Sequence, residues 1–407
     1  MNRRELIKFF SVAQVGGVLL NGIALPSTYG APYSPSATKR DLIKELGLRT
    51  FINAAGTYTA MTASLMHDEV IEAIKSSSKH FVMYNEVQDK VGEKIAAICH
   101  AEAAMVTSGC WSALVLGTAA ALTGMDKQKI ALLPNVQSFD KNEVVVQKAH
   151  YHDYFHALTN TGIIPVQVET PEETEKAINS KTALMFFLNE SAPMGKIQCE
   201  EWLMLAKKYQ VPTMIDIAAD IPPVHNLWKY TDMGFDLVCI SGGKAIRGPQ
   251  SAGMLLGRKD LIAAARLSAP PNGNNIGRGM KVNKEEILGM YAALERYVKQ
   301  DHDKEWKQWE AQIALIQRAV EEIKGVNALV SVPPIANHTP TLSISWDADL
   351  VKISRRELQQ KLRNGNPSIE VVGKNGNAIQ LTVFMLQPGE EKILARRLRE
   401  EFSRAVV

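Results

Sequence analysis

The chain has 407 residues, of which 46% are hydrophobic and 22% are charged, so it can bury a sizeable core and is neither disordered nor collagen-like. Its 46 lysines and arginines against 43 aspartates and glutamates leave a formal charge of +3, which is too even for a protein that coats nucleic acid. The four cysteines form no Cys-x-x-Cys pair, which argues against a disulfide framework and a zinc site.

The first forty residues have the order of an export signal. The chain opens MNRRELIKFF, and no charged residue occurs from Phe9 to Thr38. The pair Arg3-Arg4, then an apolar run and a Pro/Ser-rich stretch, is typical of a twin-arginine signal. Residues 1–31 are therefore predicted to direct export to the periplasm. The apolar run is short and interrupted by polar residues, so no stable membrane insertion is expected. The alternative is an uncleaved helix of a cytoplasmic protein.

From residue 32 onward the sequence predicts one enzyme in three parts. An N-terminal arm covers 32–65, a large domain covers 66–270, and an interdomain helix with a small C-terminal domain covers 271–407. In the large domain, short apolar runs alternate with helical stretches, which is typical of a mostly parallel sheet with helices on both faces. The expected fold class is therefore α/β, with a smaller α+β domain at the C-terminus.

Periodicity and turn residues locate the individual elements. The expected helices are 69–79, 87–99, 110–122, 172–179, 200–209, 284–324 and 389–405. The expected strands are 129–133, 144–147, 183–188, 211–215 and 237–240 in the large domain, and 341–346, 369–372 and 379–385 in the small domain.

Two polar residues follow two of the buried strands. The run VPTMID ends in Asp216, and the run FDLVCIS is followed by Gly242, Gly243 and Lys244. Carboxyl ends of parallel strands meet at one edge of a sheet, where such folds bind ligands. A lysine and a carboxylate there suggest pyridoxal phosphate, because this cofactor needs a lysine for its Schiff base and an acid beside its ring nitrogen. A surface lysine and a helix-capping aspartate are the structural alternative.

A second feature is the start of a helix that suits an anion. Thr107, Ser108, Gly109 and Cys110 stand between an apolar run and the helix expected at 110–122. Small residues at a helix N-terminus leave backbone N–H groups free for an anion, which the helix dipole also favours. Because no base is recognisable near Cys110, we expect it to pack or to contact the phosphate rather than to act as a nucleophile.

The order of phosphate-binding turn, aspartate and lysine resembles that of fold-type I pyridoxal-phosphate enzymes. The sequence is similar to the selenocysteine synthase (seryl-tRNA selenium transferase)-like family, especially its D-glucosaminate-6-phosphate ammonia-lyase-like branch. The resemblance covers about residues 40 to 405 and implies a fold-type I aminotransferase-like fold. Besides the Asp216 strand, it rests on INAAGTYT (52–59), NEVQDKVGEKIA (85–96), NLWKYTDMGFDLVCISGGKAIRGPQSAG (226–253), GRGMKV (277–282), KEEILGMYAALERY (284–297) and LQPGEEKILARRLREEF (386–402).

The resemblance implies roles for single residues. Lys244 corresponds to the Schiff-base lysine, and Asp216 corresponds to the partner of the pyridine nitrogen. The residues expected around the cofactor phosphate are Ser108, Gly109, Cys110 and Ser241. Asn53 and Arg247 fall near the substrate, and Arg247 and Arg278 are candidates for binding a substrate carboxylate because guanidinium offers a fork of donors. A surface ion pair is the alternative for either arginine.

His150 opens a segment with three histidines, His150-Tyr-His-Asp-Tyr-Phe-His156. It follows an expected strand at the same sheet edge, where enzymes of this fold place an aromatic ring over the cofactor. A ring-stacking or substrate-contacting role is therefore expected for His150, and an ordinary surface loop is the alternative. No metal is predicted here, because three histidines and an aspartate in one short stretch are weak evidence for a metal site.

The predicted activity is that of a pyridoxal-phosphate-dependent lyase. It would remove the α-proton of a small amino acid or aminosugar acid and eliminate a β-substituent, releasing ammonia and a 2-keto acid. An amino-acid racemase or aldolase, a selenium transferase-like enzyme, and a non-catalytic binding protein of the same fold remain as alternatives. Beyond the small amino substrate, the expected partner is a second copy of the chain in a homodimer or larger oligomer. Segment 81–91 is expected to cross over to the neighbouring subunit. No nucleic-acid partner is expected.

Overall fold

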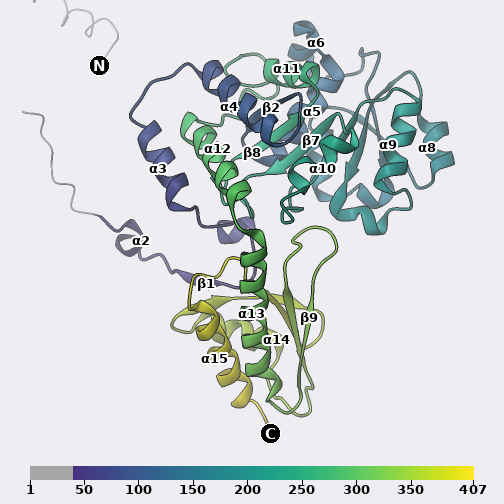
Figure 1. Ribbon diagram of the computed structural model, residues 1–407. Coiled ribbons are helices and arrows are strands. Elements are labelled where there is room, and N and C mark those ends of the chain that lie inside the picture. Colours follow the sequence, from purple (N-terminus) through teal and green to yellow (C-terminus); the bar gives the residue numbers. More distant parts are fainter. Residues whose placement is uncertain (1–39) are drawn as a thin grey trace, which may run out of the picture. The chain divides into compact units, whose positions relative to one another are not determined.

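Figure 1 shows the computed structural model of the protein, which describes residues 40–407. The chain divides into two compact units, of which the first ends at Arg49 and the second begins at Thr50. The described part of the first unit holds the short helix α2 (Leu42–Glu45). The predicted export signal at 1–31 lies outside the described residues. In the part of the chain that the structure describes, no helix is long and apolar enough to cross a membrane.

Within the described residues, the large domain is built on a seven-stranded sheet in the order β2-β8-β7-β6-β5-β3-β4. Its strands are β2 (Ala103–Thr107), β3 (Glu143–Gln147), β4 (Ile164–Val168), β5 (Thr182–Leu188), β6 (Thr213–Asp216), β7 (Leu237–Ser241) and β8 (Gly253–Gly257). Strand β8 runs antiparallel to β2 and β7, whereas the other neighbours are parallel. The predicted mostly parallel sheet is therefore confirmed.

Helices cover both faces of this sheet because its strands are apolar on both sides. In β5, Met185 and Phe187 join one core, and Leu184 and Phe186 join the other. The first core includes side chains of α4 (Tyr84–Ile98), α9 (Cys199–Lys208), α10 (Asn226–Met233) and α12 (Lys284–Lys299). The second includes side chains of α5 (Gly109–Thr123), α7 (His156–Thr159) and α11 (Lys259–Leu267). Helix α3 (Asp68–Ser77) packs against α12.

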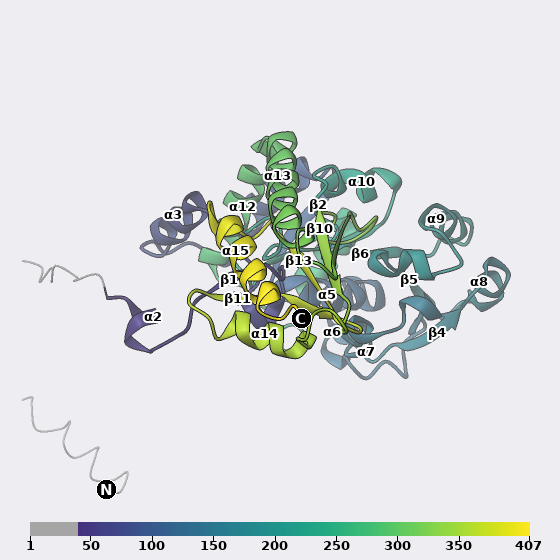
Figure 2. The same ribbon diagram turned by 90° about the horizontal axis from the view of Figure 1, so that it is seen from below.

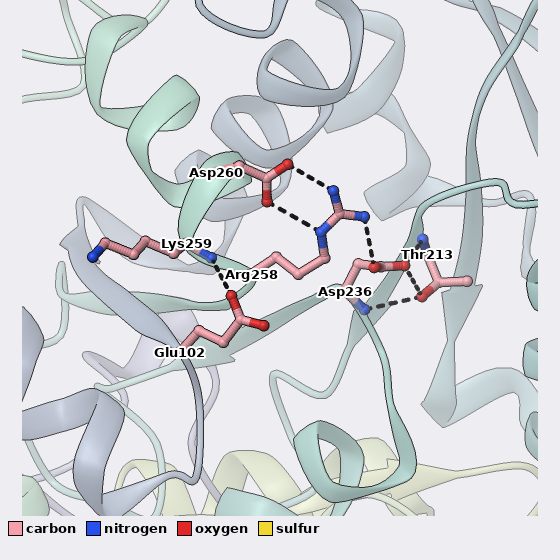
Figure 3. Close-up of polar contacts among 6 residues, drawn as sticks. All are labelled: Glu102, Thr213, Asp236, Arg258, Lys259 and Asp260. Carbon is pink, nitrogen blue, oxygen red and sulfur yellow. Dashed lines mark hydrogen bonds and ion pairs between the residues drawn. The ribbon is translucent and has the colours of Figure 1, made fainter.

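A polar network ties strand ends together at the edge of the sheet opposite the carboxyl ends (Figure 3). Asp236, just before β7, accepts hydrogen bonds from the N–H and hydroxyl of Thr213, the first residue of β6, at 2.7 and 2.9 Å. Arg258, which follows β8, pairs with Asp236 at 3.0 Å and with Asp260 at 2.6 Å. These contacts fix the strand register at one end, so the residues at the other end are aligned as well.

The small domain contains an antiparallel sheet in the order β12-β13-β10-β9. Its strands are β9 (Val326–Ser331), β10 (Thr341–Trp346), β12 (Val372–Lys374) and β13 (Ala378–Thr382). Helices α13 (His302–Glu321) and α15 (Glu390–Ser403) lie side by side and pack on it, as Figures 1 and 2 show, and α14 (Arg355–Arg363) packs near β12. In addition, β1 (Phe51–Asn53) pairs in parallel with β11 (Ser368–Glu370). This pairing joins the beginning of the second unit, just after Thr50, to the small domain.

Three predicted elements differ from the observed ones, and β4, β8, β9, α11 and α14 were not predicted. The run 369–372, predicted as one strand, falls on β11 and β12. The run 129–133, predicted as a strand, lies instead in helix α6 (Lys127–Leu132), because the Asp126 side chain caps the helix by accepting from two backbone N–H groups at 2.8 and 3.2 Å. The helical stretch 284–324 is two helices, α12 and α13, since the Asp301 side chain starts a new helix by accepting from the Lys304 N–H at 2.9 Å. Helix α8 (Pro171–Ala177) is present as expected.

Candidate active site

Three strand ends that are distant in the sequence meet at one edge of the large sheet. Asp216 ends β6, Ser241 ends β7, and Thr107 ends β2. Ser241 and Thr107 both pair with Gly253, the first residue of β8, from opposite sides. The register therefore gathers residues from three strands at the edge where open α/β sheets bind ligands.

This edge holds a cavity of about 210 Å³. The sequence-predicted residues that line it are Gly109, Cys110, Asp216, Ser241 and Lys244. Ser108 directly precedes them as the N-cap of α5. The two strands and the helix start thus bring together one amine, one carboxyl group, one hydroxyl and the first turn of a helix.

Glycines allow the walls of this cavity to approach each other. A Cβ on Gly253 would lie 2.5 Å from the carbonyl carbon of Gly109 and 2.7 Å from the Cys110 nitrogen, so only glycine lets β8 touch the start of α5. Next to Lys244, a Cβ on Gly243 would lie 2.6 Å from the Cα of Gln250. Gly109 itself has φ of +81°, a conformation that favours glycine.

The first turn of α5 presents free backbone donors to the cavity. The Ser108 side chain makes no capping hydrogen bond to the helix, because its hydroxyl is 2.8 Å from the hydroxyl of Ser112. The helix has 15 residues, and Gly109, Cys110 and Trp111 of its first turn line the cavity. Unsatisfied N–H groups at the positive end of a helix form a site for an anion such as a phosphate.

Asp216 is buried, with 3% of its surface exposed. Its Oδ1 accepts a hydrogen bond from the Ala218 N–H at 2.8 Å, and the Cys110 S–H donates to the same oxygen at 3.6 Å. Burial raises the pKa of this carboxyl group, while the Ala218 N–H and the Lys244 ammonium act in the opposite direction. A protonated ring nitrogen is a partner that would compensate the buried charge.

Asp220 is a second buried carboxyl group in the wall of the same cavity. Its Oδ1 accepts a hydrogen bond from the Asn189 amide at 2.6 Å, and the same amide donates to the hydroxyl of Tyr230 at 2.7 Å. Burial raises the pKa of Asp220 to about 7, with the hydrogen bond from Asn189 opposing the shift. This residue therefore changes charge near neutral pH.

A larger cavity of about 530 Å³ adjoins the first. The residues that line both are Thr59, Tyr154, Glu190, Ala219 and Lys244. The rest of its wall comes from the loop 55–59, from 333–341 and from strands β12 and β13 of the small domain. Lys244 thus stands between a cavity at the large sheet and a cavity that both domains form.

The three residues expected beside the substrate lie outside these cavity walls. The Asn53 amide donates to the Gly56 carbonyl at 2.9 Å and accepts from the N–H groups of Ala55 and Gly56, so it shapes the loop that lines the larger cavity. The Arg247 side chain donates to the Leu65 carbonyl at 2.7 Å. Arg278 is exposed in the loop after α11. Neither arginine lines the two cavities, and the carboxylate-binding role of both stays a prediction.

His150 also lies outside the two cavities. It is fully buried beneath β5, where its Nδ1 accepts from the Leu188 N–H at 3.2 Å and its ring meets Phe187 edge-on at 4.5 Å between centroids. Burial lowers the pKa of its imidazole to about 4. His150 lies in the 3-10 turn that follows β3, and its ring-stacking or substrate-contacting role stays a prediction.

Several cavity residues were not singled out from the sequence. Tyr154 belongs to the segment in which only His150 was considered, and Asp220 lies in the loop that follows Asp216 at the end of β6. Glu190, Trp111 and Gln250 complete this set. Within 40–407, no group of three or more His, Cys, Asp and Glu side chains is arranged to hold a metal ion.

Curated relatives align with this chain over most of its length. A D-glucosaminate-6-phosphate ammonia lyase from Salmonella typhimurium is 27% identical over 376 residues, covering 88% of this chain and 97% of the relative. A 5'-C-glycyluridine monooxygenase-decarboxylase from a Streptomyces species is 24% identical and covers 88% and 91%. An L-seryl-tRNA(Sec) selenium transferase from Clostridium botulinum is 24% identical and covers 88% and 75%.

Solved structures are also similar to this chain over most of its length. The structure of a D-glucosaminate-6-phosphate ammonia-lyase is similar with a TM-score of 0.78 and 26% identity, covering 90% of this chain and 99% of that one. A NifS-like protein, at 17% identity and a TM-score of 0.59, shares the fold. The predicted fold class is confirmed, and the predictions of an enzyme and of pyridoxal phosphate agree with these matches. Because the model of aminotransferase class-V matches residues 84–347, the chain belongs to the aminotransferase class-V family.

Proposed function

We propose that this protein is a pyridoxal-phosphate-dependent lyase that acts on an amino acid with a β-hydroxyl group. It removes the α-proton and expels the hydroxyl as water, and addition of water then releases ammonia and leaves a 2-keto acid. The observation that carries the proposal is the position of Lys244 in the walls of both cavities, with Asp216 in the wall of the smaller one. The similarity to an ammonia lyase over 88% of the chain supports the reaction type.

The smaller cavity fits the cofactor. Bound pyridoxal phosphate supplies an electron-accepting ring that stabilises negative charge on the substrate's α-carbon. The buried carboxylate of Asp216, oriented by the Ala218 N–H, would hold the proton of the ring nitrogen. The first-turn N–H groups of α5 and the Ser241 hydroxyl would hold the phosphate. Gly253 lets the strand and the helix start approach closely enough to form this cradle.

Lys244 would bind the cofactor covalently and later move the proton. Because Lys244 lines both cavities, its amine, when it is not bound to the cofactor, can reach a substrate in the larger one. The amine of Lys244, when free, would be the base for the α-proton. Tyr154 and Glu190 also line both cavities and are the groups available to protonate the departing hydroxyl.

A visible spectrum and a product assay test this function. The purified protein reconstituted with pyridoxal phosphate should show an absorption band that is lost in Lys244→Ala and kept in Lys259→Ala, a change at the opposite edge of the sheet. A panel of D- and L-hydroxyamino acids and aminosugar acids should then release ammonia and keto acid. An unchanged band in Lys244→Ala would exclude the cofactor assignment, and inversion or carbon–carbon cleavage without ammonia would identify a racemase or an aldolase.

We further propose a homodimer or larger oligomer in which 81–91 packs against a second copy. Phe81 and Met83 are exposed, and a groove of about 610 Å³ between α3 and α12 is lined by Val82, Leu288 and Tyr291. Apolar side chains gathered in this way commonly mark an interface. Sedimentation would test this: wild type should be a dimer or larger, and Phe81→Asp should shift it toward the monomer. A monomeric wild type would contradict the proposal.

The N-terminal residues carry a separate proposal. We propose that Arg3-Arg4 and the apolar run after them direct export, with cleavage near residue 31. N-terminal sequencing of protein from periplasmic and cytoplasmic fractions would test this, since an intact N-terminus found only in the cytoplasm contradicts export.

A further inference from the structure

The small-domain sheet presents a polar face to the larger cavity. Residues two apart on a strand point to the same side, and Val372 and Lys374 of β12 both line the cavity. Gln380 and Thr382 do the same on β13, where Gln380 pairs with Val372. The alternating residues Ile379 and Leu381 contribute to the domain core with α13 and α15, although Leu381 also borders the cavity. The strand alternation therefore sets an amide, a hydroxyl and an ammonium group on the cavity side.

The remaining wall of the larger cavity is also rich in uncharged polar groups. Thr57, Tyr58 and Thr59 contribute hydroxyls from the loop before α3, and Asn337 and Thr339 contribute from the loop before β10. The Asn337 N–H donates to the Ala219 carbonyl at 2.7 Å, which holds the second loop against the large domain. Apolar residues such as Ile335 and Phe384 share this wall, and the Thr339 and Thr382 hydroxyls lie 3.2 Å from each other. The other hydroxyls and amides of the wall suit a ligand that has several hydroxyl groups of its own.

Charged groups are few in this wall. Within the described residues, Lys244, Lys374 and Glu190 are the charged side chains that line the larger cavity. Since Lys244 is committed to the cofactor, Lys374 is the cation left for an anionic group of the substrate. Its ammonium forms no hydrogen bond or ion pair elsewhere in 40–407, although its backbone carbonyl accepts from the Arg355 guanidinium.

We propose that Lys374 binds the carboxylate of an unphosphorylated, polyhydroxylated amino acid whose hydroxyl groups contact the polar face of β10, β12 and β13. This inference rests on the function proposed above and names its substrate class. A phosphate ester would add between one and two further negative charges at neutral pH, and the wall offers only Glu190 as an additional charged group, which would repel them. The substrate class thus differs from that in the name of the similar ammonia lyase by the absence of the phosphate.

The first test measures binding rather than turnover. A hydroxy acid that lacks the amino group, such as a sugar acid, cannot react and can be titrated into the holoenzyme by calorimetry. Lys374→Gln should weaken its binding about tenfold to a hundredfold, as expected for one lost charge-assisted contact. Lys392→Gln, an exposed lysine on α15 that lines neither cavity, is the matched control and should bind as wild type does. Equal binding by Lys374→Gln and wild type would overturn the proposal.

The second test compares an aminosugar acid with its phosphate ester. Wild type should convert the unphosphorylated compound with at least a tenfold higher kcat/KM, and Gln380→Arg, which adds a cation to the same face, should reduce that preference. A preference of wild type for the phosphate ester would overturn the assignment. The failures are distinguishable, because absence of the visible band in wild type rejects the proposed function, whereas a wild type that shows the band but binds the hydroxy acid no better than Lys374→Gln rejects only the role of Lys374.

Discussion

Replacing Asp220 by asparagine is expected to stabilise the apoprotein at neutral and alkaline pH and to change little near pH 4. Asp220 is 2% exposed, and burial raises its pKa from 3.8 to about 7. Asparagine keeps an oxygen that can accept the hydrogen bond from Asn189, so the main change is removal of the ionisable group. The variant therefore separates the effect of charge from the effect of packing.

The sign follows from proton binding. Between pH 3.8 and about pH 7, the folded chain retains a proton on Asp220 that the unfolded chain has lost, so the free energy of unfolding falls as pH rises through this window. Each tenfold difference in proton affinity corresponds to about 1.4 kcal/mol, so the full window amounts to ~4 kcal/mol. Above pH 7 the folded wild type carries a buried carboxylate, and Asp220→Asn avoids that cost.

Urea unfolding of the apoprotein at pH 5, 6, 7 and 8 measures this. The difference in unfolding free energy between Asp220→Asn and wild type should grow by ~2 kcal/mol from pH 5 to pH 7 and then level off. Asp349→Asn, at a side chain that is 97% exposed, is the control and should change stability by less than ~0.5 kcal/mol at every pH. A pH-independent difference, or a variant less stable than wild type at pH 8, would refute the reasoning.

Three further substitutions test the cradle, the loop and the core. Gly253→Ala places a Cβ 2.5 Å from the Gly109 carbonyl carbon and should weaken cofactor binding at least tenfold in a spectral titration, whereas Gly273→Ala, which meets nothing within 4 Å, should not. Asn53→Ala removes the three hydrogen bonds that shape its loop, so we expect KM to rise about tenfold with the cofactor band unchanged. Trp202→Ala, at a fully buried site, should cost ~3–5 kcal/mol in unfolding free energy without changing that band.

The smaller cavity was predictable from the sequence because its determinants are local. An apolar strand ending in Asp216 and another followed by Gly243 and Lys244 give both the element and the edge at which the side chains lie. The small residues before α5 similarly mark a helix start with free N–H groups. In each case a few consecutive residues carry the signal, and the general geometry of parallel sheets supplies the rest.

The larger cavity was not predictable because its walls come from pairings between distant segments. The loop that follows Asn53 reaches the site because β1 pairs with β11, more than 300 residues later in the chain. Lys374 reaches it through the hairpin of β12 and β13. Residue type alone also did not predict where two side chains lie, since Arg247 donates to the Leu65 carbonyl and His150 packs in the core.

Asp216 shows how the same burial affects stability and function in opposite ways. The Asp216 carboxyl group accepts from one N–H and one S–H, burial raises its pKa, and no lysine or arginine in the described chain lies within ion-pair distance of it. An unpaired buried charge is costly, so ionisation of Asp216 reduces the stability of the fold. A ligand that brings a protonated nitrogen to Asp216 would remove that cost. Part of its affinity would therefore come from pairing a charge that is otherwise buried without a partner. Asp216 at the end of its apolar strand favours a cationic group of the ligand, and the start of α5 favours an anionic group. The site therefore suits a ligand that carries both.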